Sequence, residues 1–151
     1  MDASVKQQLY GFCKSFIDNR LVRINSNIDF LQEALTSETK SSAGDKHETG
    51  RAMIQLEREK LGNQLAEAKL LQELFKKIPL QTSFSKVGLG SVVLTDQQNY
   101  YMGISAGELK WDGVSYFAIA PNTPIGKLLL GKVVGDVVDF NSRKMVIQQI
   151  E

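Results

Sequence analysis

Apolar residues in the first half of the chain recur with the period of a helix. From Ile17 onward they follow one another at spacings of four and three: Ile17, Leu21, Ile24, Ile28, Leu31 and Leu35. This alternation is typical of the seam of a coiled coil. A second stripe contains Ile54, Leu61, Leu65, Ala68 and Phe75. Apolar periodicity stops between the stripes, so the pattern predicts an antiparallel pair of helices that turns between residues 36 and 48.

The pattern changes beyond Pro79, where glycine and β-branched residues become frequent, as expected where helix gives way to sheet. Strand-like runs occupy residues 90–96, 100–105, 115–120, 136–140 and 144–150. A short helix is predicted before the last two runs, because Thr123 suits its N-cap, Pro124 its first position and Gly131 its end.

The predicted fold class is therefore α+β. We expect a helical hairpin over residues 1–78, with its tip near residues 38–49, and an antiparallel sheet domain with one short helix over residues 80–151. Ile125, Leu128 and Leu129 of that helix are expected to pack on the sheet.

Composition and charge narrow the classes of function. The chain has 18 Lys and Arg residues against 17 Asp and Glu, so no concentrated basic face is available to hold free nucleic acid. Cys13 is the single cysteine, which excludes an internal disulfide and predicts a small buried side chain. No apolar run approaches the roughly 18 residues of a membrane span, and the N-terminus lacks a secretory pattern. We therefore expect a cytoplasmic protein without membrane contact.

The segment TPIGKLLLGKVVGD, residues 123–136, resembles the C-terminal domain of the bacterial Gre transcript-cleavage factors. That family shows a Ser-Pro-Leu-Gly start, a paired leucine, Gly-Lys and then Gly-Asp. The matching positions are Thr123, Pro124, Ile125, Gly126, Leu129, Leu130, Gly131, Lys132, Gly135 and Asp136. The resemblance implies an antiparallel coiled coil joined to an FKBP-like domain, in agreement with the predicted hairpin and sheet. It also implies that the partner is RNA polymerase, whose secondary channel the coiled coil enters.

The polar loop carries the tip motif of this family, Gly-Asp-x-x-Glu, at Gly44, Asp45 and Glu48. The resemblance implies that Asp45 and Glu48 help to hold a catalytic Mg²⁺ ion in the polymerase active site, near the 3′ end of the nascent RNA. Magnesium takes oxygen ligands, and a second metal ion can activate the attacking water. On this interpretation the protein is a monomer and not itself an enzyme, and it binds no Mg²⁺ stably alone. Without the resemblance, the pair fits a helix cap, with which metal binding is compatible.

Five basic residues are candidates for contacts with the partner. Lys40, Lys46 and Arg51 flank the loop, where they either steer RNA phosphates or are ordinary solvated charges. Lys127 and Lys132 lie in the segment that carries the resemblance, and they are candidates for a surface that faces the polymerase.

The tip departs from the family pattern after Glu48. The family continues Asn-x-Glu-Tyr, whereas this chain continues Thr49, Gly50, Arg51 and Ala52. Three hypotheses therefore stay open: a factor that stimulates RNA cleavage by backtracked polymerase, a channel-binding inhibitor, and a coiled-coil protein-binding or chaperone module.

Prolyl isomerase activity is not expected. The sequence of the C-terminal half indicates no aromatic-lined cavity. Trp111, Tyr116 and Phe117 fit packing within the sheet.

Overall fold

The structure is a computed structural model that describes residues 3–40, 44–81 and 83–151; for residues 3, 4, 38–40 and 44–49 it describes the backbone alone. The chain forms two compact units. We call Ile17–Glu73 the hairpin unit, and Met1–Phe16 together with Leu74–Glu151 the sheet unit. The functional domain boundary that we expect near Pro79 stays a prediction.

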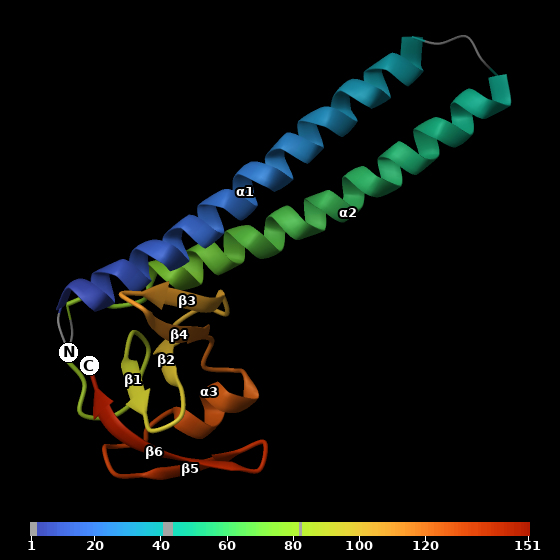
Figure 1. The fold of residues 1–151 in the computed structure, drawn as a ribbon. Helices are drawn as coiled ribbons and strands as arrows, with labels where there is room; N and C mark the ends of the chain where they lie inside the picture. The colour runs from blue at the N-terminus through green and yellow to red at the C-terminus, as the bar shows by residue number, and fades with distance from the viewer. Residues whose placement is uncertain (1–2, 41–43, 82) are drawn as a thin grey trace. The chain divides into compact units, whose positions relative to one another are not determined.

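The hairpin unit consists of most of two long helices, α1 (Ala3–Lys40) and α2 (Gly44–Lys76), which run side by side (Figure 1). Ile17, Ile24 and Ala68 of the predicted stripes are buried. Residues of both helices, among them Arg23 and Glu67, line a cavity of about 220 Å³. The stripes therefore face one another, as the spacing of four and three requires.

The sheet unit contains one sheet of six strands within the described residues. These are β1 (Val92–Thr95), β2 (Asn99–Met102), β3 (Gly107–Trp111), β4 (Val114–Ile119), β5 (Val137–Phe140) and β6 (Arg143–Ile150). Their order is β3-β4-β2-β1-β6-β5, and the short helix α3 (Pro124–Leu129) lies between β4 and β5 in the chain. The predicted α+β class is confirmed.

The expectation of a purely antiparallel sheet is wrong in one place, because β2 and β4 pair in parallel, with Tyr101 opposite Ala118. The cause is β3, a strand that the sequence analysis did not predict. β3 runs antiparallel to β4 at the sheet edge, so β4 returns in the direction of β2 and pairs with it. All other pairings are antiparallel.

One face of the sheet carries the main hydrophobic core of the unit. Its buried members are Val87, Val93, Tyr100, Met102, Ile125, Leu129, Val138, Met145 and Ile147. Ile125 and Leu129 come from α3, which therefore packs on the sheet as predicted.

The opposite face of β1 and β2 is also buried. Val92 and Tyr101 are paired in register, and neither side chain is exposed. Burial raises the pKa of Tyr101, and the nearby Cys13 and Tyr10 of α1 raise it further. Cys13 is buried as predicted, and burial raises the pKa of its thiol to about 12. The N-terminal turns of α1 therefore contribute to the core of the sheet unit.

Candidate functional site

The acidic tip motif lies at the start of α2. The backbone of this helix begins at Gly44, which places Asp45 and Glu48 in its first turn. Residues three positions apart in a helix share a face, so the backbone places these two positions on one side of α2. The side chains of Asp45 and Glu48 lie outside the described residues, as do those of Lys40 and Lys46, and their predicted roles stay predictions.

Arg51 lies farther along α2 and belongs to the described residues. Its side chain is half-buried, and its Nε atom is buried without a hydrogen-bond partner among the residues that the structure describes. A buried, unpaired donor is uncommon in folded proteins. Its role in steering RNA phosphates stays a prediction.

The first residues of α3 explain the residue types of the segment TPIG, residues 123–126. Thr123 is the N-cap, as predicted: its Oγ1 accepts a hydrogen bond from the backbone N–H of Gly126 at 3.1 Å. The same hydroxyl donates to the carbonyl oxygen of Ala120 at 2.7 Å. Pro124 occupies the first turn, where the absence of its N–H costs nothing. These contacts fix where α3 begins.

The end of α3 and the following turn depend on two glycines and an aspartate. Gly131 and Gly135 have φ angles of +82° and +94°, a region that favours glycine. Asp136 Oδ2 accepts a hydrogen bond from the N–H of Val133 at 2.8 Å. The motif that carries the family resemblance is thus accounted for by local structure over most of its length.

The segment also exposes an apolar surface. Leu128, which we expected in the core, is 39% exposed. The reason is that α3 has only six residues, and one of its faces, with Ile125 and Leu129, packs on the sheet. We call the exposed residues of this segment and of the adjoining strand the apolar strip: Leu128, Leu130, Val133, Val134 and Val137.

The two lysines of the segment differ in exposure. Lys127 is exposed, beside the apolar strip, whereas Lys132 is half-buried. The backbone of Lys132 is held by hydrogen bonds to Leu129 and Val87. Lys127 is therefore the more accessible candidate for contact with a partner.

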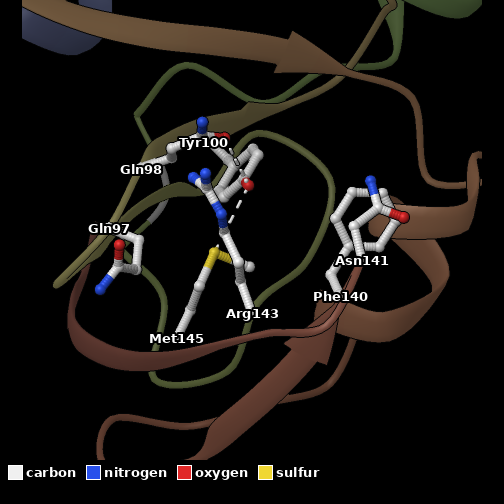
Figure 2. A pocket seen from close by; sticks show the side chains of 7 residues that line it. All are labelled: Gln97, Gln98, Tyr100, Phe140, Asn141, Arg143 and Met145. Atoms are coloured by element: carbon white, nitrogen blue, oxygen red, sulfur yellow. Dashed lines mark hydrogen bonds between the residues drawn. The ribbon is translucent and has the colours of Figure 1, made fainter.

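A cavity of about 360 Å³ lies between the β1–β2 turn and the β5–β6 hairpin (Figure 2). Tyr100 and Met145 are buried, Phe140 is half-buried, and the polar lining residues are exposed: Gln97, Gln98, Asn141 and Arg143. Tyr100 Oη lies 3.1 Å from Gln98 Oε1 and 3.5 Å from Met145 Sδ. The expectation that no aromatic-lined cavity exists is therefore wrong. The sequence offered no signal for it, because its two sides lie some forty residues apart in the chain.

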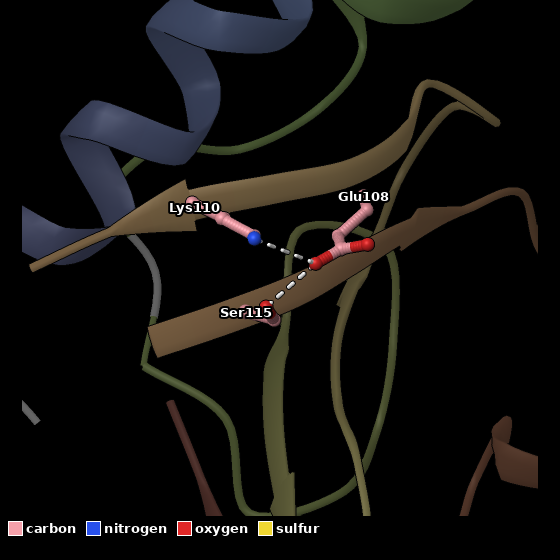
Figure 3. A network of polar contacts seen from close by, with 3 residues as sticks. All are labelled: Glu108, Lys110 and Ser115. Atoms are coloured by element: carbon pink, nitrogen blue, oxygen red, sulfur yellow. Dashed lines mark hydrogen bonds and ion pairs between the residues drawn. The ribbon is translucent and has the colours of Figure 1, made fainter. Parts of the chain in front are cut away.

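A smaller polar network lies on β3 and β4 (Figure 3). Ser115 donates a hydrogen bond of 2.7 Å to Glu108 Oε1, and Lys110 Nζ lies 3.8 Å from the same oxygen. Both charged side chains are well exposed, so the ion pair contributes little to stability. The network links the edge strand β3 to β4.

Two kinds of feature are absent from the described part of the chain. It contains no group of three or more His, Cys, Asp or Glu side chains that could hold a metal ion. No helix within it is long and apolar enough to cross a membrane.

Comparisons with known proteins leave the family open. No family model matches the chain, and no curated protein matches it. Among solved structures, that of the transcription factor Gfh1 aligns with 89% of this chain and 90% of its own, at 19% sequence identity and a TM-score of 0.35. A similarity of this degree carries no argument about function.

Proposed function

We propose that this protein is a Gre-like transcription elongation factor. It binds RNA polymerase, inserts its helical hairpin into the secondary channel, and stimulates cleavage of backtracked RNA. The observation that carries the proposal is the position of the motif Gly44, Asp45 and Glu48. The backbone of α2 begins at Gly44, so the motif occupies the first helical turn after the hairpin reverses direction.

The donor set fits part of a magnesium site. Carboxylate oxygens are the ligands that Mg²⁺ prefers, and Asp45 and Glu48 share one face of a helical turn. Two carboxylates fill only part of an octahedral shell, so the polymerase and water complete it. In that site Asp45 and Glu48 would hold the ion, which would supply an activated water and neutralise charge on the phosphate. The hairpin contributes ligands, and the polymerase performs the cleavage.

Docking on the polymerase is assigned to the segment of residues 124–136. The apolar strip there exposes Leu130 at 48% and Val134 at 55%, with the exposed Lys127 beside it. Apolar side chains grouped on a surface often mark a protein interface. The support for docking is thus the exposure of five apolar side chains within residues 128–137, with the exposed Lys127 next to Leu128 in the chain.

The proposal is tested with a stalled, backtracked elongation complex that contains labelled RNA. The parent protein should increase RNA cleavage, whereas Asp45→Asn and Glu48→Gln should bind the polymerase but lose most of the stimulation. Added Mg²⁺ should partly restore both variants, because mass action refills a weakened site. Glu57→Gln, at an exposed carboxylate farther along α2, is the matched control and should behave like the parent. If both tip variants stimulate like the parent, the acidic pair is only a helix cap.

A second candidate function is inhibition of the polymerase from the same channel. It is favoured by the departure of Thr49, Gly50, Arg51 and Ala52 from the tip pattern of the Gre factors. The same assay separates the two functions, because an inhibitor would bind and suppress cleavage. Competition with a known channel-binding factor tests the docking step. Simultaneous binding at full occupancy would exclude both functions and favour a chaperone module.

A further inference from the structure

The cavity of the sheet unit offers three kinds of chemistry at one place (Figure 2). Tyr100, Phe140 and Met145 supply apolar surface. Gln97, Gln98 and Asn141 supply carboxamides, each of which is both a donor and an acceptor. Arg143 supplies a positive charge, and no carboxylate is present among the described residues that line the cavity. The lining therefore suits a planar ligand with polar edges and a negative charge.

The side of the cavity that β1 and β2 form is held rigidly by hydrogen bonds. Thr95 Oγ1 accepts from the N–H groups of Gln97 and Gln98 at 3.1 and 2.9 Å. Asp96 Oδ1 accepts from the N–H of Val146 on β6 at 2.8 Å, which ties the turn to the opposite side of the cavity. Sites whose groups are fixed in advance lose less conformational freedom when a ligand binds.

The β5–β6 side is a tight hairpin. Phe140 and Arg143 pair across a two-residue turn, in which Asn141 and Ser142 have φ angles of +52° and +63°. This is the geometry of a type I′ turn, whose twist matches that of the strands. The turn therefore places Phe140 and Arg143 opposite one another on neighbouring strands, and both line the cavity.

The hydrogen bond from Tyr100 determines how Gln98 is presented. The Tyr100 hydroxyl donates to Gln98 Oε1, so this contact leaves both N–H groups of the Gln98 amide available as donors to a ligand. Gln97 and Asn141 add further carboxamides on the exposed rim. Carboxamides of Asn and Gln form paired hydrogen bonds with the N6 and N7 edge of adenine.

We propose that this cavity binds an adenine nucleotide. The base lies against Phe140, the carboxamides contact its polar edge, and Arg143 pairs with the phosphate. Aromatic side chains hold bases by stacking, and a guanidinium forms charge-assisted, often paired hydrogen bonds with phosphate. The volume of about 360 Å³ falls within the usual range of small-ligand sites, roughly 300–1,000 Å³. The same chemistry is offered by a free nucleotide and by an adenylate residue of single-stranded RNA.

The test is a titration of the full chain with AMP, followed by isothermal calorimetry and by the NMR signal of the Met145 methyl group. We expect saturable binding that shifts the Met145 signal and leaves that of Met53, in the hairpin unit, unchanged. Arg143→Gln should weaken AMP binding about tenfold, as expected for the loss of one charge-assisted contact. Phe140→Leu should weaken it on the same scale through the loss of stacking.

Lys144→Gln is the matched control. Lys144 is the exposed neighbour of Arg143 on β6, and successive side chains of a strand point to opposite faces. This variant should bind AMP like the parent. Equal losses of AMP affinity in the Arg143→Gln and Lys144→Gln variants would overturn the proposal, because only the net charge of the protein would then matter.

Titrations with further ligands distinguish a free nucleotide from an adenylate residue of RNA. Oligoadenylate that binds more tightly than AMP identifies RNA as the source, and equal or weaker binding identifies the free nucleotide. Three results overturn the proposal: no saturation by AMP in the millimolar range, equal binding of inorganic phosphate, or binding of a proline-containing peptide in place of AMP. The nucleotide site is independent of the proposed function in transcription, because the Arg143→Gln variant should still stimulate RNA cleavage.

Discussion

Gly126 occupies a position where a single added methyl group should disrupt the sheet unit. An ideal Cβ atom at this residue would lie 2.2 Å from the carbonyl oxygen of Ala120, 2.8 Å from Thr123 Oγ1 and 3.0 Å from the Cα of Pro121. Two of these atoms belong to the backbone and cannot rotate away. The substitution Gly126→Ala must therefore displace either α3 or the turn before it.

The size of the effect follows from two contributions. Inserting an extra carbon into a close-packed site typically costs about 1–3 kcal/mol. A displacement also breaks the cap in which Gly126 N–H donates to Thr123 Oγ1 at 3.1 Å, and an N-cap contributes about 1 kcal/mol. We expect a loss of about 3 kcal/mol in the free energy of unfolding. For a chain of this length that corresponds to a decrease in Tm of about 6–12 °C.

The assay is thermal unfolding followed by the fluorescence of Trp111, the single tryptophan, which lies on β3 of the sheet unit. Gly11→Ala is the matched control. Gly11 is an exposed residue of α1, and a Cβ atom there would meet nothing within 4 Å. This change should raise stability by about 0.5–1 kcal/mol, because alanine loses less backbone entropy than glycine in a helix. The reasoning is refuted if Gly126→Ala unfolds at the temperature of the parent.

Three further predictions concern single side chains of the sheet unit. Tyr101 Oη is buried without a hydrogen-bond partner among the described residues, so in urea unfolding Tyr101→Phe should leave stability unchanged or raise it by about 1 kcal/mol. A clear loss would reveal a partner for the hydroxyl. Ser142 has a φ angle of +63°, and Ser142→Gly should stabilise the hairpin by about 1 kcal/mol in the same experiment, because glycine adopts this left-handed conformation without strain. Unchanged or lower stability would contradict the strain. Burial raises the pKa of Cys13 from 9.0 to about 12, so its thiol should resist alkylation at pH 8 until the protein unfolds. Because the pKa of the Cys13 thiol is higher in the folded than in the unfolded protein, the contribution of the buried neutral thiol to stability is complete below about pH 9 and is lost as the pH rises toward 12. Rapid alkylation of the native protein would contradict the burial.

Local patterns in the sequence were sufficient to predict the elements with strong periodicity or strong caps. The spacing of four and three around Ile17 and Ile24 predicted α1, and the second stripe, from Ile54 to Phe75, predicted α2, because apolar residues at helical spacing occupy one side of a helix. Thr123, Pro124 and Gly131 predicted the bounds of α3, because each supplies a backbone requirement of a helix end. The break in the apolar pattern predicted a turn between residues 36 and 48, and α2 begins within that range, at Gly44.

Only the tertiary structure decided which surfaces these elements bury. β3 was missed because its sequence, GELKW, is polar and mostly exposed, and it becomes a strand by pairing with β4. Leu128 is exposed because α3 is too short to bury a second face. The cavity around Tyr100 and Arg143 exists because β1 pairs with β6, which brings distant segments together. Helix caps and seams depend on neighbours a few residues away, whereas strand partners and cavities depend on contacts between distant residues, and no short stretch of sequence encodes those.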